Sequence, residues 1–154
     1  MSIKLLVMDV DGTLTDGKIY IGDKGEMMKA FDVKDGYAIA HLLPENNIIP
    51  VIITGRSSDI VKERAKELKI TELYQGINDK LIQLKNIAEN MRCKPEEIAY
   101  IGDDENDLTC INYCGVTGCP NDAVDVVRQT VKYVCQKDGG RGAVREFVEW
   151  ILKR

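Results

Sequence analysis

Residues 3–16 decide how the rest of this chain is arranged, and they read I-K-L-L-V-M-D-V-D-G-T-L-T-D. The apolar run 3–8, interrupted only by Lys4, has the length and the branched side chains of a buried strand. It ends at Asp9 and Asp11, which are followed by a glycine turn. Because open α/β sheets bind their ligands at the carboxyl ends of the strands, this stretch predicts two carboxylates at a ligand-binding edge.

Two negative charges at the end of a buried strand are unfavourable unless a divalent cation neutralises them or one carboxyl group holds a proton. The alternative is that Asp9 and Asp11 merely begin a polar loop after a strand. A short D-x-D pattern does not distinguish these interpretations by itself. The rest of the chain has to decide between them.

Length and composition favour one compact domain spanning residues 1–154, with 44% hydrophobic and 30% charged residues. The net charge of −4 argues against a nucleic-acid surface. No apolar run approaches the roughly 20 residues of a membrane span, and the amino terminus lacks a secretion signal, so we expect a cytoplasmic protein with no membrane partner. The five cysteines are odd in number and scattered, which favours buried thiols over disulfides or a zinc site at Cys110 and Cys114.

Strand-like and helix-like segments alternate along the chain. Two short strands flank a glycine-rich turn and predict a β-hairpin at about residues 18–31. We expect Asp35 to cap the next helix, which would run through Leu43 and be closed by Pro44. Further strands are expected at about 48–54, 72–75, 98–101, 115–118 and 131–134, with helices at about 57–69, 78–91, 123–128 and 142–152 and a short one ending near 113. This alternation predicts an α/β fold, with a doubly wound, Rossmann-like parallel sheet of five or six strands and helices on both faces.

Three predicted strand ends and one helix start carry polar groups that a parallel sheet would bring to the same edge. They are D-V-D-G-T at 9–13, I-I-T-G-R at 52–56, I-G-D-D-E-N-D at 101–107 and, at the helix start, N-D-K at 78–80. This ordered set resembles the haloacid dehalogenase superfamily of phosphotransferases, whose motifs are a D-x-D, a Ser or Thr, a Lys and an acidic cluster. The resemblance implies a phosphoric monoester hydrolase.

The chemistry explains the residue types. An anionic nucleophile approaches a phosphate dianion only if cations shield both, and Mg²⁺ is a hard ion that prefers oxygen ligands. The resemblance implies that Asp9 attacks phosphorus and that Asp9, the backbone carbonyl of Asp11 and Asp103 bind the metal. Asp11 would protonate the leaving oxygen and later take a proton from water. Thr54 and Lys80 would bind the phosphoryl group, whereas Asp104 and Asp107 would support the metal ligands from behind, with a solvated loop as the alternative for Asp104.

The intervals between these motifs are too short for a separate cap domain, so the site must be closed by another subunit or by a large substrate. The predicted hairpin carries more apolar surface than an isolated ribbon can bury, in the side chains Ile19, Ile21, Met27, Met28 and Phe31. We therefore expect a homo-oligomer formed through the hairpin. The alternative is that the hairpin packs on its own domain.

Nearly the whole chain resembles the capless subgroup typified by 3-deoxy-D-manno-octulosonate 8-phosphate phosphatases, on the motifs D-V-D-G-T-L-T-D-G-K-I-Y, K-A-F-D-V-K-D-G-Y, L-Y-Q-G and G-G-R-G-A-V-R-E. This implies a homotetramer in lipopolysaccharide biosynthesis that hydrolyses an eight-carbon sugar-acid phosphate. Nine-carbon, sialic-acid-type ulosonate 9-phosphates are the alternative substrates, and a non-catalytic assembly domain related to acylneuraminate cytidylyltransferases is the alternative role.

Arginine follows the T-G motif in the eight-carbon enzymes, and glutamate does so in some nine-carbon enzymes. This chain has Gly55 and Arg56 there, and Arg64 lies one to two helical turns further on. Arginines bind carboxylates and hydroxyls through charge-assisted bonds. We expect Gly55, Arg56 and Arg64 to contribute to substrate binding, with ordinary surface positions as the alternative for the arginines. Arg141 lies in a glycine-rich segment that either reaches a neighbouring site or simply enters the last helix.

Overall fold

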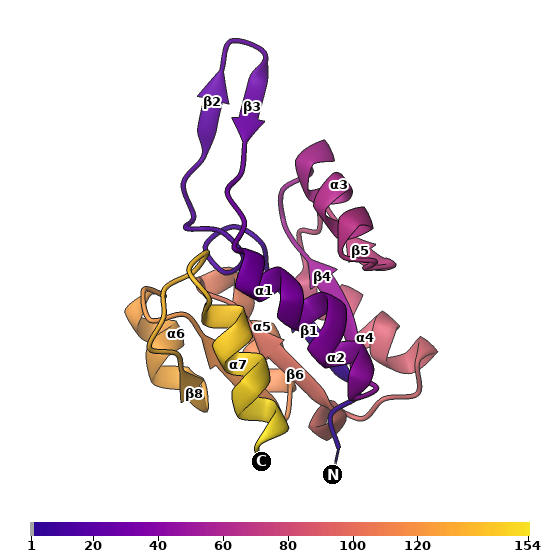
Figure 1. Ribbon diagram of the computed structural model, residues 1–154. Helices are drawn as coiled ribbons and strands as arrows, with labels where there is room; N and C mark the ends of the chain where they lie inside the picture. Colours follow the sequence, from indigo (N-terminus) through magenta and orange to yellow (C-terminus); the bar gives the residue numbers. More distant parts are fainter. Residues whose placement is uncertain (1) are drawn as a thin grey trace.

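The computed structural model describes residues 2–154 and contains a parallel sheet with β1 near its centre (Figure 1). The sheet has six strands in the order β5-β4-β1-β6-β7-β8. Their bounds are β1 Leu5–Met8, β4 Ile49–Ile53, β5 Glu72–Tyr74, β6 Ile98–Ile101, β7 Val116–Cys119 and β8 Tyr133–Val134. In register, Met8 lies opposite Ile52 on one side and Ile101 on the other. The carboxyl ends of these central strands therefore meet at one edge, as the sequence predicts.

Helices cover both faces of the sheet (Figure 1). They are α1 Val33–Tyr37, α2 Leu43–Glu45, α3 Asp59–Glu67, α4 Lys80–Asn90, α5 Leu108–Tyr113, α6 Asp125–Thr130 and α7 Ala143–Leu152. Successive side chains of β1 point to opposite faces: Leu6 and Met8 join the core under α1, α3 and α7, whereas Leu5 and Val7 join the core under α4, α5 and α6. The predicted doubly wound α/β fold is confirmed, with a fully apolar central strand because both of its faces are buried.

A β-hairpin, β2 Tyr20–Gly22 and β3 Gly25–Met28, forms a separate antiparallel sheet that projects from the carboxyl edge of the main sheet (Figure 1). Gly25 closes the turn with φ of 107°, a backbone conformation that favours glycine. Ile21, Met27 and Met28 are more than half exposed. The hairpin lies within the predicted range, and its tip does not pack on its own domain.

The helix after the hairpin begins earlier than the sequence suggests. Asp32, not Asp35, is the N-cap: its side chain accepts hydrogen bonds from the backbone N–H groups of Lys34 and Asp35. Asp35 lies in the first turn and is buried, with Oδ1 accepting from the backbone N–H of Arg145 in α7 at 2.9 Å. The prediction was wrong because either aspartate has the chemistry of a cap, and only the contact with α7 removes Asp35 from that role.

The same helix also continues past its predicted end. Between α1 and α2 the residues Ala38–Leu42 form a π-helical turn, in which the N–H of Leu43 bonds to the carbonyl of Ala38. Pro44 then falls at the start of α2, directly after the π-helical turn, and the helical backbone continues through it. Pro44 therefore does not close the helix, which ends after Glu45.

The chain between β1 and β4 contains only the hairpin and the α1–α2 helix, and the chain between β4 and α4 contains only α3 and β5. Within residues 2–154 there is therefore no cap domain, as predicted. Within residues 2–154 we also find no helix whose length and apolar character would let it cross a membrane.

We predict that Asp32→Ala lowers the free energy of unfolding by about 1 kcal/mol, because two backbone N–H groups at the start of α1 lose their acceptor. Urea denaturation measures this change. Asp23→Ala, in the exposed hairpin turn, is the matched control and is expected to leave the free energy of unfolding unchanged. Equal stability of the Asp32→Ala variant and the wild type would contradict the capping assignment.

Candidate active site

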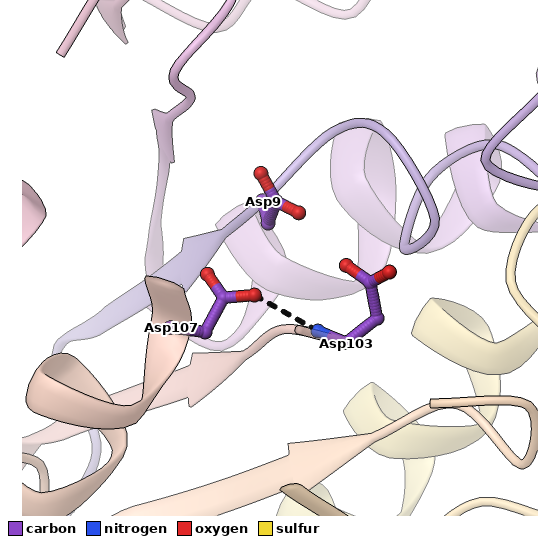
Figure 2. Close-up of side chains that lie close together, drawn as sticks. All are labelled: Asp9, Asp103 and Asp107. Carbon is purple, nitrogen blue, oxygen red and sulfur yellow. Dashed lines mark hydrogen bonds between the residues drawn. The ribbon is translucent and has the colours of Figure 1, made fainter. Parts of the chain in front are cut away.

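Three carboxylates gather where β1 and β6 end (Figure 2). Asp9 directly follows β1, Asp103 follows β6 after one glycine, and Asp107 closes the short 3-10 turn Glu105–Asp107. One carboxylate oxygen from each residue lies within 4.8 Å of the other two. The sheet register causes this convergence, because Met8 and Ile101 are paired and the chain continues from both in the same direction.

Lys80 is the cation in this cluster. It is the first residue of α4, its side chain is 2% exposed, and its Nζ lies 2.9 Å from Asp9 Oδ1 and 2.9 Å from Asp107 Oδ1. A lysine at a helix N-terminus is opposed by the helix dipole, so the two carboxylates must hold it there. Three carboxylates facing one ammonium leave an excess of negative charge, which a divalent cation would neutralise.

Asp107 is saturated with donors. Its Oδ1 accepts from Lys80 and from the hydroxyl of Tyr100 at 2.5 Å, and its Oδ2 accepts from the backbone N–H groups of Asp103 and Asp104 at 3.0 and 3.1 Å. Four donors occupy both of its oxygens, whereas Asp103 receives a hydroxyl bond from Thr13 at 3.1 Å. These contacts support the predicted role of Asp107 as a residue that orients Lys80 and Asp103.

Two glycines make room for these carboxylates. A Cβ atom on Gly12, which has φ of 90°, would lie 1.9 Å from Asp103 Oδ2. A Cβ atom on Gly102 would lie 2.4 Å from the Asp107 carboxyl carbon. The glycine of the D-x-D-G motif is therefore needed both for its backbone conformation and for the close approach of Asp103.

Burial and mutual repulsion shift the pKa values of the cluster in the absence of a cation. Burial, together with Asp9, raises the pKa of Asp103 to about 9, and burial and Asp107 raise the pKa of Asp9 against the opposing effect of Lys80. Burial alone would lower the pKa of Lys80, but Asp9 and Asp107 outweigh it and raise this pKa, so the ammonium stays charged. Asp9 and Asp103 thus form a paired site whose charged form needs a cation.

Thr54 follows β4 at the same edge and is 2% exposed. Its backbone N–H bonds to the carbonyl of Tyr74, and its carbonyl accepts from Ile77. Gly55 and Arg56 come next and are exposed. The parallel pairing of β4 with β1 thus brings the predicted phosphate-binding threonine to the end of the sheet where Asp9 lies.

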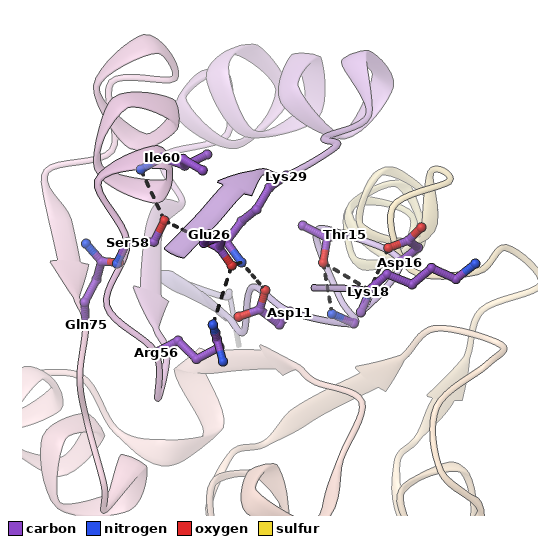
Figure 3. Close-up of polar contacts among 12 residues, drawn as sticks. Asp11, Thr15, Asp16, Lys18, Glu26, Lys29, Arg56, Ser58, Ile60 and Gln75 are labelled. Carbon is purple, nitrogen blue, oxygen red and sulfur yellow. Dashed lines mark hydrogen bonds and ion pairs between the residues drawn. The ribbon is translucent and has the colours of Figure 1, made fainter. Parts of the chain in front are cut away.

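The side chain of Asp11 does not join the carboxylate cluster. It turns towards the base of the hairpin, where Oδ1 lies 2.5 Å from Lys29 Nζ (Figure 3). Lys29 also bonds to Glu26 Oε2 at 2.9 Å, and Glu26 lies 3.6 Å from the guanidinium of Arg56. The two aspartates of the D-x-D motif therefore have different surroundings, as their different predicted roles require.

The remaining predicted residues are more distant from the carboxylates. Arg64 stacks over the ring of Phe31, donates to the carbonyl of Asp32 and pairs with Glu67, so within one chain it packs under α1 rather than beside the cluster. Arg141 is exposed and shares a shallow hollow with Asp32 near the hairpin base. Asp104 is exposed and caps the 3-10 turn, so its carboxylate does not reach the cluster.

Sequence reasoning missed Lys29, Glu26, Ser58 and Tyr100 as site residues. Tyr100 is the one residue with a polar atom in its apolar strand, I-A-Y-I, and a fully buried hydroxyl needs a partner. Lys29 interrupts the apolar residues of M-M-K-A-F. Nothing in the sequence pattern shows that its side chain turns inward, because that depends on the loop after β1.

We predict that the metal-free protein loses stability as the pH rises from about 4, the ordinary pKa of an aspartate, to about 9, the raised pKa of Asp103. In this range the folded protein holds a proton that the unfolded chain releases, so the free energy of unfolding falls with pH. Urea denaturation in EDTA at pH 5 and pH 8 measures this difference.

Asp103→Asn is expected to reduce that pH dependence, because the variant has no carboxyl group to ionise there. Asp104→Asn removes the same charge from an exposed position in the same turn and serves as the control. An Asp103→Asn variant with an unchanged pH dependence of stability would contradict the claim that burial and Asp9 raise the pKa of Asp103.

Known proteins match this chain over nearly its full length. The family model for haloacid dehalogenase-like hydrolases matches residues 70–147. The 3-deoxy-D-manno-octulosonate 8-phosphate phosphatase of Yersinia pestis is 44% identical over 98% of this chain and 80% of its own length. The Moraxella catarrhalis phosphatase of that name, in complex with magnesium, phosphate and the sugar acid, has a TM-score of 0.93 at 43% identity over 98% of this chain and 86% of its own.

The cobalt-bound Haemophilus influenzae phosphatase is 34% identical, with a TM-score of 0.94 over 99% of this chain and 88% of its own. Its fold and that of the Moraxella enzyme thus match this structure across almost the whole chain. With the family model and the relatives in agreement, this chain belongs to the haloacid dehalogenase-like hydrolases, in the capless family of the 3-deoxy-D-manno-octulosonate 8-phosphate phosphatases.

Proposed function

We propose that this protein is a Mg²⁺-dependent phosphatase that hydrolyses 3-deoxy-D-manno-octulosonate 8-phosphate to the free sugar acid and phosphate. The observation that carries this proposal is the meeting of Asp9, Lys80 and Asp103 at one sheet edge, at the distances given above. The similarity of nearly the whole chain to phosphatases of this substrate supports the choice of sugar. The protein would act in the cytoplasm, as a single domain of residues 1–154, in lipopolysaccharide precursor synthesis.

The donor set fits magnesium. Asp9 and Asp103 supply hard carboxylate oxygens in a partly buried site with excess negative charge, and the backbone carbonyl of Asp11 would complete the protein ligands. The bound ion would neutralise this charge and polarise the phosphoryl oxygens. Asp107 is excluded as a ligand by its four donors, so it would act by orienting Asp103 and Lys80.

In the first step, an Asp9 carboxylate oxygen forms a bond to phosphorus while the bond from phosphorus to the sugar oxygen breaks. Asp11 gives its proton to that departing oxygen, so the sugar leaves as a neutral alcohol. Lys80, which already contacts Asp9, and the hydroxyl of Thr54 would neutralise and hold the phosphoryl oxygens. The product on the enzyme is the Asp9 aspartyl phosphate.

In the second step, water attacks phosphorus, and Asp11 takes the proton from that water. The bond between phosphorus and the Asp9 oxygen breaks, which releases inorganic phosphate and restores both the Asp9 carboxylate and the protonated Asp11. The two aspartates have the separate surroundings that these roles need: Asp9 lies in the cluster with Lys80, and Asp11 lies outside it beside Lys29.

Substrate selection would depend on groups at the rim of the site. Gly55 and Arg56 follow Thr54, and Arg56 is half exposed and held only loosely by Glu26 at 3.6 Å, so its guanidinium is available to a sugar carboxylate. Arg141 lies beyond the hairpin base, and Arg64 would have to leave Phe31 or act from a neighbouring chain.

The hairpin would join four copies of the chain. Ile21 and Met27 are 65% and 69% exposed, and an isolated two-stranded ribbon with such side chains is neither stable nor soluble by itself. A homotetramer assembled through the hairpins would cover these side chains and would enclose a site that has no cap domain.

We predict that Asp9→Asn lowers kcat by at least about 10⁴-fold, the order seen when a catalytic nucleophile is removed. The free energy of unfolding of the metal-free variant should equal or exceed that of the wild type, because the variant lacks the buried Asp9 carboxylate that Asp107 repels. Phosphate release with Mg²⁺ and with EDTA measures the activity. Turnover that survives in Asp9→Asn, or in the wild type with EDTA, would contradict the mechanism.

For the substrate, we predict a kcat/KM at least about tenfold higher for the eight-carbon than for the nine-carbon ulosonate phosphate, or about 1.4 kcal/mol in transition-state binding. Arg56→Gln should narrow this ratio. Arg92→Gln, an exposed arginine beyond the far end of α4, is the control. A preference for the nine-carbon substrate would be consistent with the proposed mechanism but would contradict the eight-carbon substrate.

For the assembly, light scattering after gel filtration should find a homotetramer in the wild type. Ile21→Lys combined with Met27→Lys should yield smaller species, because charges would enter the contact between hairpins. Ile82→Lys changes a side chain that is 60% exposed on α4, away from the hairpin, and should leave the tetramer intact. A wild-type monomer would show that the hairpin is not an assembly surface.

A further inference from the structure

The inner end of the hairpin is part of the active site of its own chain. Lys29 follows β3 directly, and its side chain is 1% exposed although the hairpin tip projects into solvent. Its ammonium group lies between two carboxylates, 2.5 Å from Asp11 Oδ1 and 2.9 Å from Glu26 Oε2 (Figure 3). A buried ammonium group is unfavourable unless carboxylates compensate its charge, and Asp11 and Glu26 do so for Lys29.

Glu26 fixes Lys29 from the other side. Its Oε1 accepts from the hydroxyl of Ser58 at 3.0 Å, and its Oε2 faces the guanidinium of Arg56 at 3.6 Å. Ser58 is itself held in place, because its hydroxyl caps α3 at Ile60 and its N–H bonds to the side chain of Gln75 at 2.9 Å. Lys29 is thus anchored to the loop after β4 as well as to the loop after β1.

This anchoring determines how Asp11 is presented. Among the described residues, Lys29 is the one side chain that donates a hydrogen bond to the Asp11 carboxylate, and Oδ1 accepts it. Its Oδ2 therefore remains for another partner. Without Lys29 the carboxylate would rotate about its side-chain torsions, since the loop that carries it offers no second donor to the side chain.

We propose that Lys29 is a positioning residue for catalysis: it holds Asp11 so that Oδ2 faces the leaving oxygen and, later, the attacking water. This inference rests on the proposed function and adds a role for the hairpin that is separate from assembly. Lys29 need not touch the substrate, and its effect passes through Asp11. Removing it should therefore impair proton transfer without removing the metal ligands or the nucleophile.

The test compares kcat for the eight-carbon sugar-acid phosphate in the wild type, Lys29→Met, Asp11→Asn and the double variant. We expect Lys29→Met to lower kcat by about tenfold or more, part of the 10²–10⁴-fold that a general acid contributes. The double variant should lose no more than Asp11→Asn alone, because both changes disable one unit. Losses that multiply in the double variant would overturn the inference.

A second substrate separates positioning from general damage. The leaving group of 4-nitrophenyl phosphate is a weaker base than a sugar alkoxide and needs less protonation. Lys29→Met should therefore lose less kcat on this substrate than on the sugar phosphate, and Lys29→Arg should restore part of the loss on the sugar phosphate. Equal losses on both substrates would overturn the inference.

Two controls complete the design. Lys24→Met removes an exposed lysine from the turn of the same hairpin and should retain wild-type kcat. Urea denaturation and light scattering must show that Lys29→Met is folded and assembled like the wild type. A wild type that releases no phosphate from the sugar phosphate would contradict the proposed function, whereas a normal wild type with a fully active Lys29→Met would contradict only this inference.

Discussion

The concentration of negative charge at the end of β1 is the constraint on which the rest of this structure depends. One carboxylate oxygen each from Asp9, Asp103 and Asp107 lies within 4.8 Å of the other two, and the ammonium group of Lys80 contacts Asp9 and Asp107. Burial and mutual repulsion raise the pKa values of Asp9 and Asp103, so the site is unfavourable without a cation. The carboxylates would therefore favour a divalent ion, and the positive charge of that ion would in turn attract a phosphate dianion.

The surrounding fold serves this site from several directions. The central strands bring Asp9, Thr54 and Asp103 to one edge, and α4 delivers Lys80 from its first residue. The hairpin, which projects from the same edge, supplies Lys29 beside Asp11. The proposed metal-binding half of the site is thus built on strand ends, whereas the proposed acid–base half depends on a ribbon that is itself stabilised by contacts at its base. On the proposed mechanism, this division would let a capless domain fix the position of Asp11, the proposed proton donor, although solvent can approach it.

Much of this could be predicted from the sequence, because apolar runs that stop at polar residues reveal both the strands and the edge at which they end. The order of Asp9, Thr54, Lys80 and Asp103 along the chain sufficed to predict where they meet. The errors have a different origin. Asp32 and Asp35 are equally good caps locally, and only packing against α7 decides between them. The π-helical turn before Pro44, the inward turn of Lys29 and the partner of Tyr100 likewise depend on segments distant in the sequence, which local patterns do not report.

The central claim, that Asp9 is the nucleophile of a phosphatase, is tested most directly by trapping its phosphoryl adduct. Asp11→Asn should slow the attack of water more than the departure of 4-nitrophenol, so the variant mixed with radiolabelled 4-nitrophenyl phosphate and Mg²⁺ should accumulate labelled protein. Acid quenching and peptide mass spectrometry would then locate the label. The account predicts an acyl phosphate on the peptide that contains Asp9, with no label in an Asp9→Asn, Asp11→Asn double variant. Label on another residue, or phosphate release with no labelled protein, would contradict it.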